Sequence, residues 1–148
     1  MSSKSSYVDL GLPSGTLWSI ANAGGDNAFY TYDEAIQKFG GQLPTKEQLL
    51  ELVELCKWTT VSRGCKVFGP NGNFIFLPAN GAINCDGVHE MTMKDKEFFG
   101  AYMSSTICDS DEIYGLAFTP YALNDEYGGY YVEDFNRCIS YSVRLVKN

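Results

Sequence analysis

The chain has 148 residues, of which 45% are hydrophobic and 20% are charged, and its formal net charge is −7. This length and composition predict one globular domain rather than a disordered segment. The eleven Lys and Arg residues are scattered, so nucleic acid and anionic membrane surfaces are not expected as partners. No apolar run approaches the length of a membrane span, so direct membrane insertion is not expected either.

We expect residues 1–148 to form a single domain, because no internal repeat, low-complexity tract or long linker interrupts the chain. Residues 1–6 are polar and are predicted to be disordered or to be an artificial leader. They contain no hydrophobic segment, so no signal peptide is visible, although the same residues could remain after an export signal is trimmed.

The first half of the chain predicts a short strand at residues 7–10 followed by two helices. Thr31 with Glu34, and Thr45 with Gln48, match the capping box, in which side chains satisfy backbone N–H groups at the start of a helix. Apolar residues recur with helical spacing after each box. The sequence therefore predicts two amphipathic helices.

The second half predicts strands, because beyond Trp58 the apolar residues follow a two-residue period. Residues 79–100 are predicted to be irregular. Alternation over the closing segment predicts a half-buried strand with Tyr141 in the core, and Phe118 is also predicted to be buried. Two helices flanking a mostly antiparallel sheet, with a long irregular loop region, define an α+β fold. The predicted strands are residues 66–68, 74–77, 114–118, 130–132 and 139–146.

The five cysteines are widely spaced and include no C-x-x-C pair. Structural zinc sites need closely spaced ligands, and His89 is the single histidine, so no zinc site is expected. Buried free thiols are the favoured interpretation, and one or two disulfides are the alternative. The cysteines are Cys56, Cys65, Cys85, Cys108 and Cys138.

Four segments of the chain, in order, resemble a known family. They are residues 7–18 (YVDLGLPSGTLW), 43–52 (LPTKEQLLEL), 69–78 (GPNGNFIFLP), and 102–106 (YMSST) together with 141–146 (YSVRLV). In these segments the chain is similar to a paralogous domain of gut Bacteroidetes and Fibrobacter proteins, described as the Fibrobacter succinogenes major paralogous domain. The chain departs from the family pattern at Gly41-Gln42, where Trp-Arg is usual, and at Met103, where Trp is usual.

The resemblance implies a C-type lectin-like fold, in which the N- and C-terminal strands lie side by side and a long loop region bears the ligand site. It also implies a relation to formylglycine-generating enzymes and to the variable proteins of diversity-generating retroelements. The variable proteins place their diversified residues before a fixed closing strand. A bacterial cell surface or a phage particle is the location that the resemblance implies.

No metal and no cofactor are expected. Sugar-binding C-type lectins use a Glu-Pro-Asn or Gln-Pro-Asp triplet and a Trp-Asn-Asp segment to bind calcium, and this sequence has neither. Asp109, Asp111 and Glu112 offer oxygen ligands, but their spacing does not fit an EF-hand loop. A solvated acidic loop is therefore the favoured interpretation.

Two cysteine arrangements are candidates for catalysis, and neither is favoured. Cys85 and His89 share a short segment, but a thiolate nucleophile needs a base beside it in space. Cys108 and Cys138 invite comparison with the cysteine pair of formylglycine-generating enzymes, but the motif residues around that pair are absent. The sequence therefore favours a protein that is not an enzyme.

A tyrosine-rich region near the C-terminus is the strongest functional signal. Tyr and Asn suit a contact surface, because they combine rigid rings with adaptable hydrogen-bonding groups. The alternative is that the same rings pack within strands and loops. The predicted ligand-binding residues are Tyr114, Tyr121, Asn124, Asp125, Tyr127, Tyr130, Tyr131 and Asn136.

Together these features predict a surface or phage receptor-type module that binds a protein or a glycan through this face without calcium. A retroelement-diversified receptor is one form of this hypothesis. Two alternatives stay open: a structural or accessory domain of a larger bacterial surface protein, and an oxidase related to formylglycine-generating enzymes. An oligomer is compatible with each of them.

Overall fold

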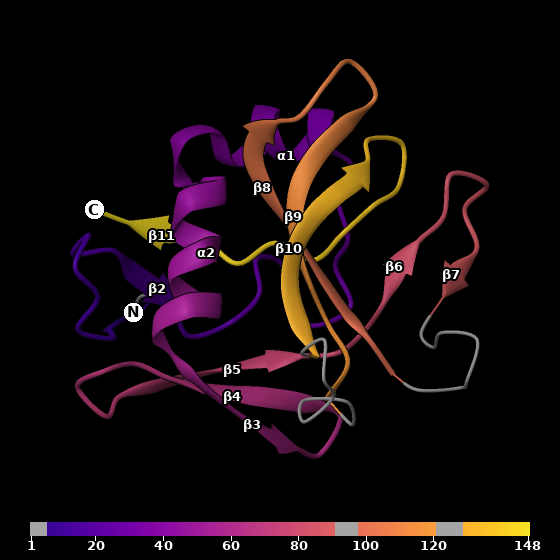
Figure 1. Cartoon of the computed structure of the whole chain (residues 1–148). Helices are drawn as coiled ribbons and strands as arrows, with labels where there is room; N and C mark the ends of the chain where they lie inside the picture. The colour runs from indigo at the N-terminus through magenta and orange to yellow at the C-terminus, as the bar shows by residue number, and fades with distance from the viewer. Residues whose placement is uncertain (1–5, 91–97, 121–128) are drawn as a thin grey trace.

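A computed structural model describes residues 6–90, 98–120 and 129–148 (Figure 1). These residues form an α+β fold with two α-helices and several small antiparallel sheets, as the sequence predicts. The helices are α1 (Tyr32–Phe39), the 3-10 helix η1 (Gly40–Gln42) and α2 (Lys46–Leu55). The strands are β1 (Tyr7–Asp9), β2 (Leu17–Ser19), β3 (Lys57–Val61), β4 (Gly64–Phe68), β5 (Phe74–Pro78), β6 (Ala82–Ile83), β7 (His89–Glu90), β8 (Gly100–Ile107), β9 (Glu112–Phe118), β10 (Tyr130–Asn136) and β11 (Val146–Lys147).

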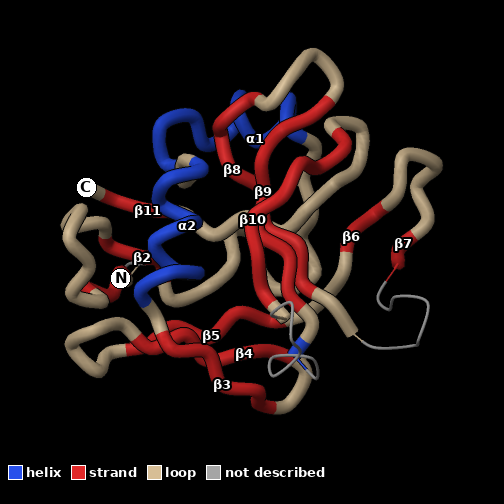
Figure 2. Tube along the Cα trace, in the orientation of Figure 1, coloured by secondary structure: helices blue, strands red, loops and turns tan. Residues whose placement is uncertain are grey.

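The central sheet has the strand order β10-β9-β8, and α2 lies beside it (Figure 2). The other sheets of the described ranges are β3-β4-β5, β1-β2-β11 and the pair β6-β7. Neighbouring strands are antiparallel throughout these sheets. The sheet β1-β2-β11 brings the first and last strands together, so both ends of the chain lie on one side of the domain (Figure 1).

Both predicted helices are confirmed, and each begins after the predicted threonine. The backbone N–H of Glu34 donates to the Thr31 hydroxyl, while the N–H of Thr31 donates to the Glu34 carboxylate. Thr45 and Gln48 make the same reciprocal pair at the start of α2. Gly40 follows α1 with a φ of 52°, a conformation that favours glycine, so the helix ends there.

The central sheet separates two hydrophobic clusters, because side chains alternate between the two faces of a sheet. Leu116 and Phe118 belong to the cluster that includes the apolar face of α2. Ile113 and Met103 belong to the cluster that includes α1 and Tyr141. The predictions that Phe118 and Tyr141 are buried are confirmed.

The predicted strand over 139–146 is wrong in its extent. Only Val146–Lys147 forms a strand, and residues 140–142 make isolated bridges to three other segments. Alternation misleads here because Ser142 and Arg144, the polar members of the pattern, are as buried as their apolar neighbours. The segment is therefore enclosed on both sides.

Arg144 is 2% exposed and joins the closing segment to other parts of the fold. Its Nε and Nη2 donate to Asn22 Oδ1 at 2.9 and 2.6 Å. Its Nη1 donates to the Ser19 carbonyl at 3.0 Å, and Nη2 also donates to the Phe76 carbonyl at 2.7 Å. Asn22 donates in turn to the Tyr102 hydroxyl at 3.1 Å. Burial lowers the pKa of Arg144, because little water reaches its charge.

Strand β10 continues four residues beyond the predicted end at residue 132. Glu133 and Asp134 have low strand propensity, but antiparallel pairing with the whole of β9 outweighs it. The longer strand places Glu133 and Phe135 on the same face of the sheet as Tyr131. The segment predicted to be irregular also contains the short strands β6 and β7, and β8 follows it.

Candidate ligand-binding groove

A groove of about 280 Å³ lies against the face of the central sheet that carries Tyr131. Its walls come from β10, from β9 and the residue after it, from β6, from the start of β8, and from the segment that follows β10. The groove is lined by Ala82, Asn84, Phe99, Ala101, Ala117, Phe118, Thr119, Tyr131, Glu133, Asp134, Phe135, Asn136, Ile139 and Tyr141. Small and aromatic side chains dominate this surface, and β10 supplies more of it than any other strand.

The floor of the groove is apolar and closely packed. Phe135 is buried and stacks on Tyr141, with 4.5 Å between the ring centroids. A Cβ atom added to Gly115 would lie 2.2 Å from the Phe135 ring, so glycine at this position leaves the space that the ring fills. Tyr131 stays 40% exposed at the rim, where its ring is available to a ligand.

The groove is acidic. Its lining includes Glu133 and Asp134 and no Lys or Arg. Alternation along β10 puts the Glu133 side chain on the groove face, while the Asp134 side chain lies on the opposite face, beside Glu112. Burial, with a further contribution from the charge of Asp134, raises the pKa of Glu133. The Glu133 charge contributes, after burial, to raising the pKa of Tyr131 and of Tyr141. Glu133 shares one face of β10 with Tyr131, two residues away. Among the described residues, it has no hydrogen-bond or ion-pair partner.

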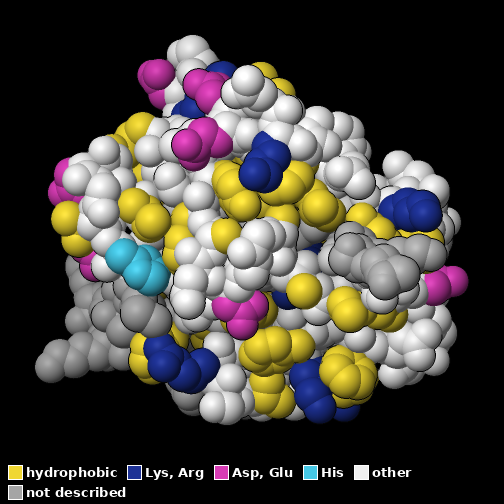
Figure 3. Space-filling view, turned by 180° about the vertical axis from the view of Figure 1, so that it is seen from behind, with side chains coloured by type: hydrophobic (Ala, Val, Ile, Leu, Met, Phe, Trp, Pro, Cys, Tyr) yellow, Lys and Arg dark blue, Asp and Glu magenta, His cyan; other side chains and the backbone are white. Residues whose placement is uncertain are grey.

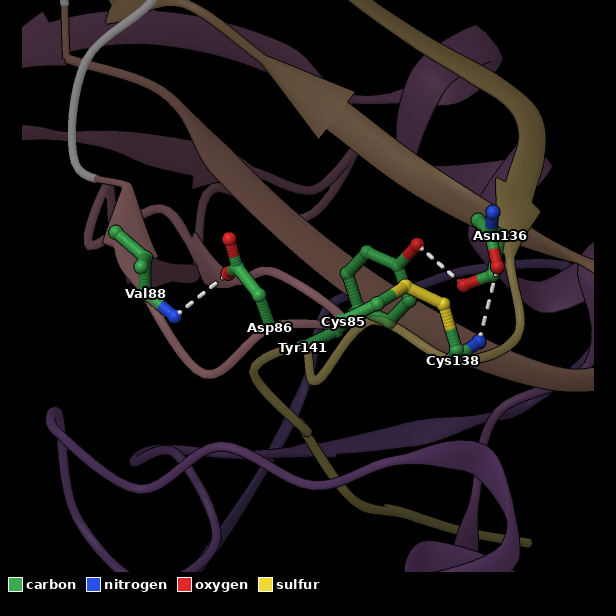
Figure 4. The surroundings of a disulfide bond; sticks show 6 residues. All are labelled: Cys85, Asp86, Val88, Asn136, Cys138 and Tyr141. Atoms are coloured by element: carbon green, nitrogen blue, oxygen red, sulfur yellow. Dashed lines mark hydrogen bonds between the residues drawn. A yellow bond between two sulfur atoms is a disulfide. The ribbon is translucent and has the colours of Figure 1, made fainter.

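A disulfide joins Cys85 to Cys138 and holds two walls of the groove together (Figure 4). Cys85 directly follows the lining residue Asn84, and the N–H of Cys138 donates to Oδ1 of the lining residue Asn136 at 3.0 Å. The Tyr141 hydroxyl donates to the Asn136 carbonyl at 2.7 Å. The segment after β10 is therefore fixed against the chain that leaves β6.

The disulfide corrects the interpretation of all five cysteines as free thiols. Cys85 and Cys138 are 53 residues apart, so no local spacing pattern reveals the pair. The prediction of buried free thiols is confirmed for Cys56 and Cys65, while Cys108 is free and exposed. A disulfide is consistent with an extracytoplasmic location.

The disulfide also bears on both catalytic arrangements. In this state Cys85 has no free thiol to act with His89, and His89 Nε2 lies 2.8 Å from the Asn80 carbonyl instead. Cys138 is bonded to Cys85, so it does not form a pair with Cys108.

Two of the predicted ligand-binding residues, Tyr131 and Asn136, line the groove. Strand alternation places Tyr130 and Tyr114 on the opposite face of the central sheet. There the Tyr130 ring stacks on Trp58, with 4.5 Å between the ring centroids and 6° between the ring planes. This contact agrees with the alternative that the tyrosine rings pack within strands and loops. The other four predicted residues, Tyr121, Asn124, Asp125 and Tyr127, lie outside the described residues.

Lys46 covers the Tyr114 ring, with its Nζ 4.0 Å from the ring centroid. Tyr114 is therefore already in contact with a cation of its own chain. Of the predicted contact residues that the structure describes, Tyr131 and Asn136 line the groove, whereas Tyr114 and Tyr130 lie on the opposite face of the sheet.

Sequence reasoning missed Glu133, Phe135, Ile139 and the β6 wall of the groove. Strand β10 extends to Asn136, and the two-residue period of a strand then places Glu133 and Phe135 on the face of Tyr131, but the adjacent acids at 133 and 134 hide this extension in the sequence. No comparable local signal brings β6 to this strand, because the contact depends on tertiary structure.

The predicted acidic loop forms a cluster on the turn between β8 and β9. Ligand atoms of Cys108, Asp109 and Glu112 lie within 4.8 Å of one another. Hydrogen bonds with Asp134 and then Asp109 raise the pKa of Glu112 to about 7, so the carboxyl group retains a proton that its neighbours share.

Replacing Glu112 by glutamine is expected to flatten the pH dependence of stability. The folded pKa of Glu112 is raised from 4.5 to about 7, so the folded chain holds this proton more tightly than the unfolded chain. The resulting stability is present below pH 4.5 and is lost as the pH rises through about 7. Denaturant unfolding across this range measures the slope.

Glu54→Gln is the matched control, because Glu54 is exposed on α2 and the change removes the same charge. Its slope should match that of the wild type. An unchanged slope in Glu112→Gln would contradict the shared proton.

Basic side chains do not gather on the face of the molecule seen in Figure 3. Lys and Arg lie there in separate places, interspersed with apolar and uncharged groups. The face in Figure 3 therefore offers no extended basic surface to a polyanion.

No described helix has both the length and the apolar character needed to cross a membrane.

Fold and site together define an α+β domain with an acidic groove that is lined by aromatic and small residues. Comparison of the chain with protein-family models, with curated proteins and with solved structures found no match. The role of the groove is therefore argued from its own residues.

Proposed function

We propose that this chain is a non-catalytic binding module that recognises a protein or a glycan at the groove without calcium. The observation that carries the proposal is the exposed Tyr131 ring beside Glu133, above an apolar floor and behind a disulfide-bonded wall. Exposed aromatic rings next to polar groups supply contact area at low entropic cost, and the rigid walls reduce the ordering needed on binding.

The arrangement of the ends of the chain supports a C-type lectin-like fold. Strands β1 and β11 share a sheet through β2, two helices precede the central sheet, and the resemblance of the sequence runs along most of the chain. Met103, where the family has Trp, is fully buried and fills a core position. Membership of the Fibrobacter succinogenes major paralogous domain family is part of this proposal.

The proposed setting is a bacterial cell surface or a phage particle, which the disulfide supports. A retroelement-diversified receptor is the more specific form of the proposal. Comparison of the gene with a nearby near-identical template repeat tests it, because diversification leaves adenine-specific differences. Their absence would remove this form of the proposal and leave the binding role intact.

Screening the purified chain on glycan and surface-protein arrays is expected to yield ligands that bind equally with calcium and with a chelator. The physical reason is that contact at the groove uses rings and side-chain hydrogen bonds, and no lectin calcium triplet is present. Binding that disappears with the chelator would contradict the calcium-independent mode.

The variant Tyr131→Ala distinguishes the receptor proposal from the alternative of a structural or accessory domain. If array binding is unchanged while light scattering shows that the oligomeric state collapses, the ring serves subunit contact and the receptor proposal fails. The oxidase alternative has no support in the described cysteines, because Cys138 pairs with Cys85 rather than with Cys108.

A further inference from the structure

We propose that the groove accepts an arginine side chain presented by a protein partner. This inference rests on the binding role proposed above and names the chemical class of its ligand. It starts from the combination of charge and shape in the groove: an acidic wall, an aromatic rim and an apolar floor.

Charge favours a cationic ligand. Glu133 shares the groove face of β10 with Tyr131, the lining holds no basic residue, and the whole chain carries a net charge of −7. The one ion pair among the described residues joins Arg137 to Asp33, so Glu133 is not neutralised there. The Glu133 carboxylate is exposed at the groove and has no partner among the described residues, so it is open to a cation that reaches it.

The positions of Tyr131 and Glu133 suit a planar cation. They are two residues apart on one face of β10, which places them about 7 Å apart along the strand. A guanidinium group can stack on the Tyr131 ring and donate two parallel hydrogen bonds to the Glu133 carboxylate. Asn84 donates to Glu90 through Nδ2 at 3.2 Å, which leaves its Oδ1 as a further acceptor in the lining.

The floor suits the aliphatic part of the same side chain. Ala117, Phe135 and Ile139 offer apolar surface beneath the acidic wall, and an arginine stem carries three methylene groups that pack on such surface. A lysine ammonium lacks the planar fork, and a sugar has hydroxyl groups but no positive charge for Glu133. These features favour arginine over both.

NMR titration of the ¹⁵N-labelled full chain tests the inference. The probes are N-acetylarginine N-methylamide, the corresponding lysine compound, and the corresponding citrulline compound, which has nearly the shape of arginine but no charge. N-acetylglucosamine serves as the glycan probe. Each is added to the wild type, to Glu133→Gln and to Glu54→Gln, which removes the same charge from the exposed face of α2.

The arginine probe is expected to shift the amide signals of groove residues such as Ala117, Tyr131 and Phe135. Citrulline and lysine should bind more weakly, citrulline by about tenfold, and Glu133→Gln should weaken the arginine probe by about tenfold. Glu54→Gln should stay within about twofold of the wild type.

Four outcomes would each overturn the arginine assignment. They are equal affinity for the arginine and citrulline probes, unchanged affinity of Glu133→Gln for the arginine probe, amide shifts located outside the groove, and no amide shift at all. If the sugar shifts groove residues and arginine does not, the assignment fails while the binding role stands. If no probe shifts the groove and array ligands bind Tyr131→Ala as they bind the wild type, both proposals fail.

Discussion

Replacing Arg144 by methionine is expected to lower the free energy of unfolding by about 3–5 kcal/mol. Methionine keeps most of the apolar stem but removes four hydrogen bonds to Asn22, Ser19 and Phe76. Each buried acceptor left without a donor costs about 1–3 kcal/mol, and relief of the buried charge offsets part of that sum. Urea denaturation followed by circular dichroism measures the change.

Arg137→Met is the matched control, because it makes the same chemical change at the surface. Arg137 pairs with Asp33 at 2.8 Å, but the Asp33 side chain is 78% exposed, so we expect a loss below about 1 kcal/mol. If both variants lost the same stability, the network around Arg144 would not have the role assigned to it.

Removing the disulfide with Cys85→Ala and Cys138→Ala together is expected to lower the free energy of unfolding by about 2–4 kcal/mol. The bond closes a loop across 53 residues, and losing it gives the unfolded chain more conformations. Because the same bond holds Asn84 against the segment after β10, binding of array ligands should weaken as well. Denaturation of the oxidised wild type, the reduced wild type and the double variant measures the effect.

Cys108→Ala is the control for the disulfide, since this thiol is exposed and unpaired. It should leave stability and binding unchanged. In the native wild type, Cys108 should be the thiol that reacts fast, because burial raises the pKa of Cys56 to about 11 and that of Cys65 to about 12. Equal stability of the double variant and the wild type would contradict the bracing role of the disulfide.

Local patterns in this sequence predict local structure well. The threonines at 31 and 45 mark the starts of both helices, because a capping box is complete within four residues. The strands predicted at 66–68 and 74–77 are likewise confirmed and pair as β4 and β5, because Gly69, Pro70, Asn71 and Gly72 between them favour a turn.

The failures occur where distant segments decide the outcome. Arg144 reads as the solvent-facing member of a strand, but partners more than sixty residues away bury it. The Cys85–Cys138 pair and the β6 wall of the groove depend on contacts of the same kind. The sequence therefore predicts Tyr131 and Asn136 as ligand-binding residues, but it does not predict the acidic, apolar groove that both residues line.

The central claim, that the groove is the binding site, is tested most directly by the Kd of an array ligand for two aromatic variants. Tyr131→Ala removes a ring that is 40% exposed at the groove, and Phe74→Ala removes one that is 42% exposed on β5 and lines no part of it. We expect Kd to rise at least about tenfold for Tyr131→Ala and to stay within about twofold for Phe74→Ala. Unchanged affinity in Tyr131→Ala, or an equal loss in Phe74→Ala, would contradict the claim.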